Sequence, residues 1–123
     1  MYIKRINNSS WYNGTYYYKD SNHTILHRED GPAIEFANKT KHWYLNGKYH
    51  REDGPAIEYF NEGKRWYLNG ERHREDGPAI IYDDGSKAYY LNHKWFSKNE
   101  YIQYINQNTI CPVKKAKILK QCT

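Results

Sequence analysis

The chain has 123 residues, a formal net charge of +5 at pH 7, 38% apolar residues and 14 tyrosines. That length is typical of one domain, and no stretch rich in Gly, Ser or Pro indicates a linker between two. No segment approaches the roughly 20 apolar residues of a membrane span, and no apolar run follows the basic residues near the N-terminus. We therefore expect one soluble, cytoplasmic domain (1–123) with a thin, aromatic core.

Residues 1–26 resemble the later repeats only weakly. The segment "WYNGTYYYKDSNHTIL" keeps aromatic residues and an Asn-Gly pair, but it needs an insertion to align with the copies that follow. Terminal units of a repeat array are usually atypical. We interpret residues 1–26 as a degenerate N-terminal capping repeat.

Residues 27–96 carry three copies of one phrase, and this phrase determines the predicted fold. The letters "HREDGPA" begin at His27, His50 and His73, which are 23 residues apart. Aromatic and apolar columns keep the same spacing in the positions that follow. Such a period is typical of one supersecondary unit that is stacked because it cannot bury its apolar face alone.

Each period contains two short runs rich in β-formers and two reversals. In the second copy, "PAIEYF" and "KRWYLN" are separated by "NEG", which predicts a β-hairpin. The following "LNG" places Asn-Gly where a tight turn needs positive φ. No helical periodicity appears before residue 97. The array is therefore predicted to be mainly β, a single-layer antiparallel meander of stacked hairpins.

Strand alternation divides the side chains of each copy between two faces. In the second copy Trp66 and Leu68 point one way and Tyr67 points the other. We expect the first aromatic column to bury the apolar face: Trp43, Trp66 and Tyr89. We expect the next column to form a wetter row on the opposite face: Tyr44, Tyr67 and Tyr90.

Residues 97–107 predict a short capping helix. Ser97 and Glu100 have the Ser-x-x-Glu spacing in which two side chains satisfy free amides at a helix start. Beyond them, an apolar stripe at helical spacing is expected from Tyr101, Ile102, Tyr104 and Ile105. We expect the helix to lie over the last strand and to protect that edge from pairing with another chain.

Residues 108–123 form a basic tail whose structure the sequence leaves open between helix, strand and a fold induced by a partner. Both cysteines, Cys111 and Cys122, lie here, so no disulfide framework holds the repeats together. This favours a reducing compartment, although a bridge within the tail remains one alternative.

The 23-residue period, the Tyr-x-Asn-Gly turn and the "HREDGPA" phrase resemble a MORN-type repeat protein over residues 27–96. The chain is similar to the variant associated with tailed phages, giant viruses and some bacteria, and "WFSKNEYIQYI" resembles the ending that follows such arrays. The resemblance implies an elongated sheet of hairpins that serves as an interaction surface and is not an enzyme. Ordinary MORN repeats have a Gly-rich His-Gly-x-Gly where "HRED" stands here, so their lipid-binding roles are not carried over.

The repeated motif has a metal interpretation and a structural one. His, Glu and Asp are good ligands for zinc, manganese or iron, but repeat columns stay about one repeat apart while metal ligands converge. The structural interpretation has Asp bonding backbone amides, Gly supplying unusual φ, and Arg pairing with Glu of a neighbouring repeat. We favour this second interpretation and expect no metal and no cofactor. The predicted turn residues are Asp30, Gly31, Asp53, Gly54, Asp76 and Gly77.

We expect no enzymatic activity, because the chain has no Gly-x-Ser-x-Gly elbow, no Walker loop and no nucleophile beside a base. Our first hypothesis is a protein-interaction module, a phage-type factor that binds and blocks a host protein. The tyrosine row resembles a paratope more than an interior. The expected partner face comprises Tyr44, Tyr67, Tyr90, Lys41, Lys64, Arg51 and Arg74.

Two alternatives remain open from the sequence. The first is a ligand-binding module for a nucleotide signal or nucleic acid, in which Arg and Lys contact phosphate while a tyrosine stacks on a base. The second is a structural protein that assembles through unprotected sheet edges.

Overall fold

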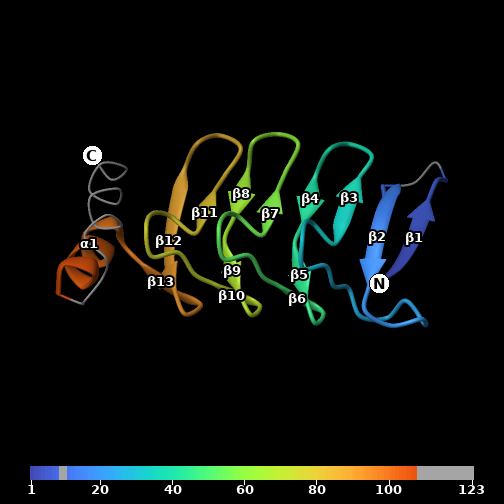
Figure 1. Cartoon of the computed structure of the whole chain (residues 1–123). Coiled ribbons are helices and arrows are strands. Elements are labelled where there is room, and N and C mark those ends of the chain that lie inside the picture. The colour runs from blue at the N-terminus through green and yellow to red at the C-terminus, as the bar shows by residue number, and fades with distance from the viewer. Residues whose placement is uncertain (9–10, 108–123) are drawn as a thin grey trace.

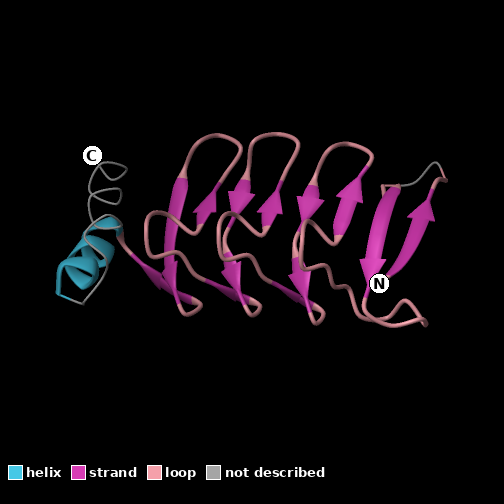
Figure 2. Ribbon diagram, in the orientation of Figure 1, coloured by secondary structure: helices cyan, strands magenta, loops and turns pink. Residues whose placement is uncertain are grey.

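The structure is a computed structural model that describes residues 1–8 and 11–107 (Figure 1). Nine strands form one antiparallel sheet in the order β1-β2-β3-β4-β7-β8-β11-β12-β13. They are β1 (Tyr2–Ile6), β2 (Gly14–Tyr18), β3 (Ile34–Phe36), β4 (Lys41–His42), β7 (Ile57–Glu58), β8 (Lys64–Arg65), β11 (Ile80–Ile81), β12 (Lys87–Leu91) and β13 (Lys94–Phe96). Two small hairpins, β5 (Tyr44–Leu45) with β6 (Lys48–Tyr49) and β9 (Tyr67–Leu68) with β10 (Glu71–Arg72), lie beside it, and α1 (Lys98–Gln107) follows β13 (Figure 2). The predicted single-layer meander with a C-terminal helix is confirmed.

The Asn-Gly turns have the predicted geometry. Asn46 and Gly47, between β5 and β6, have φ of 51° and 78°. Both values are positive, as the turn of a two-residue hairpin requires. The second copy repeats them, and in the third copy Asn92 and His93 adopt φ of 50° and 68°. The turn is therefore kept even where His93 replaces glycine.

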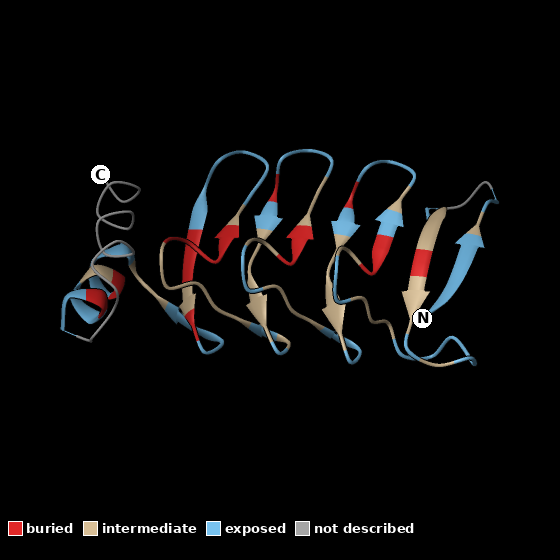
Figure 3. Cartoon of the chain, in the orientation of Figure 1, coloured by how far each residue is buried: buried red, intermediate tan, exposed pale blue. Residues whose placement is uncertain are grey.

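The buried residues form a stripe across the strands rather than a thick core (Figure 3). Its alanines are fully buried and its isoleucines are at most 5% exposed: Ala33, Ala56, Ala79, Ile34, Ile57 and Ile80. His42 lies opposite both Ile34 and Ile57, and Arg65 lies opposite Ile57 and Ile80, so polar residues alternate with isoleucine along this row. The sheet is therefore stabilised by a narrow apolar line and by contacts on its two faces.

The expected burial of the first aromatic column is confirmed only at its end. Tyr89 is 5% exposed, but Trp43 and Trp66 are only half-buried. A single-layer sheet has no second layer to cover these rings, and an arginine of the next copy lies over each of them instead. The position expected to be apolar core is thus a stacking platform.

The capping helix begins as predicted. Ser97 N–H donates to Glu100 Oε1 at 3.3 Å, and Glu100 N–H donates to Ser97 Oγ at 3.2 Å. Hydrogen bonds from the side chain and the backbone of Ser97 hold the pKa of the Glu100 carboxyl below its usual range. Tyr101 and Ile105 are buried against Tyr89 of β12. In the described residues no helix combines the length and apolar character needed to cross a membrane.

The two ends of the sheet differ. At the C-terminal end α1 packs on β12 and β13. At the N-terminal end β1 pairs with β2, and its outer edge has no partner strand among the described residues. Tyr2 and Ile3 of this edge strand are each 46% exposed. The predictions for residues 108–123, including those for Cys111 and Cys122, lie outside the described residues.

Candidate functional site: the two faces of the sheet

Alternation along β4 and β5 separates two chemically different faces. On one side Trp43 stands with Leu45 and the motif segments. On the other side His42 lies within 6.3 Å of Tyr44 between ring centroids. We call the side with Trp43 the groove face and the side with His42 and Tyr44 the tyrosine face.

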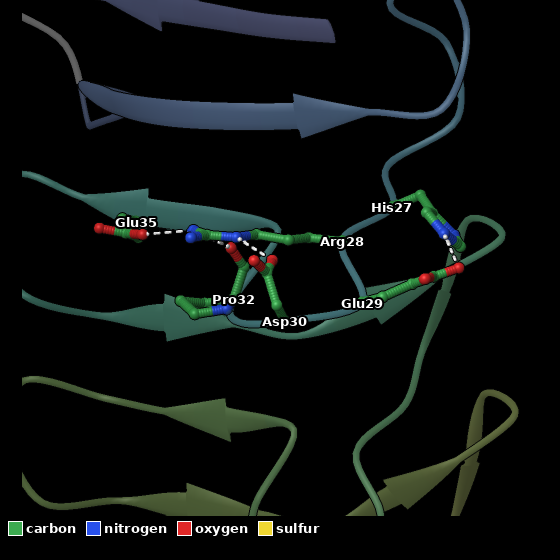
Figure 4. Close-up of polar contacts among 6 residues, drawn as sticks. All are labelled: His27, Arg28, Glu29, Asp30, Pro32 and Glu35. Atoms are coloured by element: carbon green, nitrogen blue, oxygen red, sulfur yellow. Dashed lines mark hydrogen bonds and ion pairs between the residues drawn. The ribbon is translucent and has the colours of Figure 1, made fainter. Parts of the chain in front are cut away.

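On the groove face the motif arginine makes three hydrogen bonds within its own copy through Nε and Nη1. Arg28 Nε donates to Asp30 Oδ1 at 3.0 Å, and Arg28 Nη1 donates to Glu35 Oε1 at 2.7 Å and to the Pro32 carbonyl at 3.3 Å (Figure 4). Arg51 makes the same three bonds one repeat later. This differs from the prediction, because Asp accepts from arginine rather than from backbone amides, and the glutamate belongs to the same copy.

Beside the strand pairs β4–β7 and β8–β11, a cation–π contact links successive copies. The Arg51 guanidinium carbon lies 3.9 Å from the centre of the Trp43 ring in the preceding copy, and Arg74 lies 3.8 Å from Trp66. Each stack joins a planar cation to the face of an aromatic ring, which is favourable when water is partly excluded. The repeated arginine and tryptophan therefore hold the array together.

The motif glycine has a steric role. A Cβ on Gly54 would stand 2.9 Å from the guanidinium carbon of Arg51, and one on Gly31 would stand 3.1 Å from that of Arg28. Neither glycine adopts a left-handed φ. The predicted conformational reason is therefore wrong at these two positions, where glycine instead leaves room for the arginine.

The motif histidines are structural. Nδ1 of His27 accepts the backbone N–H of Asn46 at 2.9 Å, and the same bond recurs from Asn69 to His50. The Nε2 of His27 lies 3.4 Å from Glu29. No three His, Cys, Asp or Glu side chains in the described part of the chain gather closely enough to hold a metal ion. Each imidazole thus ties a motif to the following tight turn, which is Asn-Gly in the first two copies and Asn92–His93 in the third.

Successive motifs enclose two grooves one repeat apart. The first has a volume of about 730 Å³ between the motifs of Arg28 and Arg51, and the second has about 550 Å³ between those of Arg51 and Arg74. The carboxylates that face solvent here are strongly exposed, with 85% of the Glu52 side chain and 89% of the Asp53 side chain accessible. Since the arginines are already neutralised, the grooves present net negative charge, which disfavours phosphate.

The tyrosine face is a run of packed rings. Tyr44 stacks on Tyr49 with centroids 4.4 Å apart, and Tyr49 lies 5.1 Å from Tyr67. Burial, together with a hydrogen bond to Tyr49, raises the pKa of Tyr44. Burial also lowers the pKa of His42 to about 4, so this ring is neutral at physiological pH. The N-terminal half of the face is thus an uncharged aromatic cluster.

The C-terminal half of this face is more exposed and carries cations. Arg72 lies 4.1 Å over the ring of Tyr90, and Trp95 stands opposite Tyr90 on β13. Tyr82 is 41% exposed and Trp95 is 59% exposed. Aromatic rings and arginine are the residue types enriched in protein interfaces.

The structure brings together only part of the predicted partner face. Tyr44 and Tyr67 meet through Tyr49, and Tyr90 continues their column. Lys41 and Lys64, however, lie opposite Glu58 in the sheet, on the side of the motif arginines. The cations and the tyrosines of the predicted partner face therefore lie on opposite faces: Lys41, Lys64, Arg51 and Arg74 on one, Tyr44, Tyr67 and Tyr90 on the other. This also separates the predicted phosphate contacts from Tyr44 and Tyr67, the predicted base-stacking rings.

Sequence reasoning missed the residues around Arg65. They lie on the tyrosine face between the second and third copies, where Arg65 is flanked by Tyr59 and Tyr82. A signal for them was present in the repeat alignment, because one column reads His42, Arg65 and Ala88 while its neighbours hardly change.

No protein-family model, curated protein or solved structure matches this chain. Its function must therefore be argued from the two faces themselves.

Proposed function

We propose that the protein is a non-enzymatic interaction module that binds another protein through the tyrosine face. The observation that carries this proposal is the combination of exposed rings and arginine over β8 to β13. Tyr82 and Trp95 are large, exposed and rigid, and they occur beside Arg65 and Arg72. Such side chains provide contact area at low entropic cost and dominate interface energetics.

The partner class we propose is a host protein, bound in the host cytoplasm and blocked by steric occlusion. This part rests on the resemblance of the repeated phrase to phage and giant-virus repeat proteins of the MORN type. The array itself supplies what occlusion needs, because its face is continuous over several strands.

Affinity purification from a bacterial lysate, followed by mass spectrometry, tests the proposal. The tagged protein is compared with a Tyr82→Ala, Trp95→Ala variant and with a Lys41→Ala, Lys64→Ala variant, which changes the groove face. We expect a stoichiometric protein that the first variant loses and the second retains. Loss with the lysine variant alone would move the interface to the groove face. Repeated absence of any stoichiometric protein would refute the interaction proposal.

One observation favours a nucleotide or nucleic-acid ligand as a second candidate. Arg65 lies beside two tyrosine rings on one face, which is an arrangement that can stack a base and contact phosphate. Absorbance at 260 nm that co-purifies with the protein and is lost in Arg65→Ala would support this candidate. A native mass equal to that of the polypeptide alone would count against it.

A further inference from the structure

The guanidinium of Arg65 lies near two tyrosine rings and makes no hydrogen bond or ion pair within the described residues. Its central carbon lies 5.9 Å from the centre of the Tyr59 ring and 6.0 Å from that of Tyr82. No described residue forms a hydrogen bond or an ion pair with it. Arginine carries five N–H donors, so this half-buried side chain holds unused donors between two aromatic walls.

The motif arginines differ from Arg65, because they make hydrogen bonds and ion pairs with carboxylates. Arg51 bonds two carboxylates and a carbonyl and lies 3.9 Å over Trp43. In the first copy the position of Arg65 is taken by His42, whose ring is surrounded by Phe36, Tyr44, Tyr49 and Tyr59. Arginine between two rings thus occurs at one copy of this column, which makes the place distinct within a repetitive sheet.

A small pocket opens at this place. It has a volume of about 190 Å³ and is lined by Tyr59, Arg65 and Tyr82, with Asn61 and Asp83 also in its wall. Gly63 allows the Tyr59 ring to lie here, since a Cβ would come within 3.2 Å of that ring. Pockets for small molecules usually measure about 300–1,000 Å³. The volume therefore suits one side chain of a partner better than a nucleotide.

Charge selects the kind of side chain. Arg65 is a cation whose planar fork pairs with a carboxylate through two parallel N–H···O bonds. Asp83, which accepts from Asn61 at 3.5 Å, places one negative charge in the pocket wall. Arg65 attracts and Asp83 repels an anion in proportion to its charge, so the titration includes inorganic phosphate to separate it from a carboxylate.

We propose that the pocket of Tyr59, Arg65 and Tyr82 receives a Glu or Asp side chain of an acidic protein partner. This inference rests on the proposed function and gives it a recognition point. The carboxylate bonds the guanidinium, and its methylene groups lie between the tyrosine rings. Arg72, over Tyr90 on the same face, adds a second positive charge to attract an acidic segment.

A direct titration tests the pocket without a known partner. The probe is the blocked tripeptide acetyl-Gly-Glu-Gly-amide, added to the isotope-labelled full chain, and the readout is the NMR shift of the Arg65 Nε–H. We expect a saturable shift that is absent with acetyl-Gly-Gln-Gly-amide. Asp83→Asn should tighten binding about two- to three-fold, and Tyr82→Ala should weaken it by a similar factor.

Three outcomes of the titration would overturn the inference. They are no shift at Arg65 with the glutamate peptide, an equal shift with the glutamine peptide, and a shift with inorganic phosphate alone. In the lysate experiment, a partner that binds Arg65→Gln as well as the unchanged protein would refute this pocket while leaving the interaction module intact. Matched unfolding curves for the unchanged chain and for Arg65→Gln exclude a folding defect as the cause of lost binding.

Discussion

The two faces use the same side chain in opposite ways. On the groove face, Arg51 donates from Nε and Nη1 to Asp53, Glu58 and the Pro55 carbonyl and stacks on Trp43. On the tyrosine face, Arg65 lies near two rings without a polar partner in the described residues. The repeated arginine thus has carboxylate partners and builds the array, whereas the arginine that breaks its column has none, which is why we propose the recognition point there.

The largest expected effect comes from removing an arginine that makes three hydrogen bonds and a ring contact. Arg51→Ala leaves two carboxylates and a carbonyl without their donor and uncovers a tryptophan, so we expect a loss of about 3 kcal/mol in the free energy of unfolding. Arg65→Ala should cost about 1 kcal/mol or less, as is usual for a partly exposed residue without polar partners. Urea unfolding followed by tryptophan fluorescence measures both. Equal losses would break the distinction between the faces.

Arg51→Lys is the control for charge alone. Lysine keeps the positive charge but cannot bond two acceptors with a planar fork or stack as a flat cation. Its expected stability lies between those of the unchanged protein and Arg51→Ala. A variant as stable as the unchanged protein would show that charge, and not geometry, links the copies.

The next effect concerns pH and the aromatic cluster of the tyrosine face. The pKa of His42 is about 4 in the folded chain, because burial disfavours the cation, while an unfolded histidine has a pKa of about 6.5. The contribution of His42 to the free energy of unfolding is therefore complete above about pH 6.5. It falls as the pH drops toward 4, because the unfolded chain then binds a proton that the folded chain excludes. Allowing for partial exposure, we expect a loss of about 1–2 kcal/mol.

Thermal melts between pH 7.5 and 4.5 measure this loss. His42→Phe should flatten the dependence, since phenylalanine has no proton to gain and suits a site among four rings. An unchanged slope in His42→Phe would assign the pH dependence to other groups.

The smallest expected effect comes from substitutions in a turn that belongs to neither face. Lys39, Glu62 and Gly85 occupy the same turn in successive copies, with φ of 79°, 74° and 86°. Glu62→Gly should therefore stabilise the chain by about 0.5–1 kcal/mol, because left-handed φ is unfavourable for residues with a Cβ. Gly85→Lys should destabilise the chain by a similar amount, because lysine is unfavourable at this positive φ. No clash adds to that cost, since open space surrounds the position. Opposite signs in melting temperature confirm the turn, and equal signs contradict it.

The strands, turns and capping helix could be predicted because their signals are local. The period of the motif, the Asn-Gly pair and the Ser97–Glu100 spacing each describe a few neighbouring residues. Which aromatic column faced the isoleucines could not be predicted in this way. Alternation separates Trp66 from Tyr67, but only the pairing of Ile57 with Arg65 decides which of them shares a face with Ile57.

The candidate site required contacts that the sequence does not specify. Lys41 and Tyr44 are close in the chain and were expected to act together, yet their side chains leave opposite faces of the sheet. The Arg51–Trp43 stack spans two copies and involves a glycine chosen for space rather than for φ. The substitution of Arg65 within its column was visible in the sequence, but its meaning depends on the rings of Tyr59 and Tyr82 from adjacent copies.

The place of Tyr101 has a consequence for the number of binding points that such an array can carry. Its ring lies on Tyr89 as the motif arginines lie on the tryptophans, with centroids 4.8 Å apart, and its hydroxyl bonds the Arg74 carbonyl. The contacts of the helix therefore involve only the last copy, and they do not depend on how many copies precede it. A duplication of residues 50–72 would lengthen the sheet, leave this terminus unchanged and repeat Tyr59 and Arg65, so that the proposed binding point would occur twice and bind a partner bivalently.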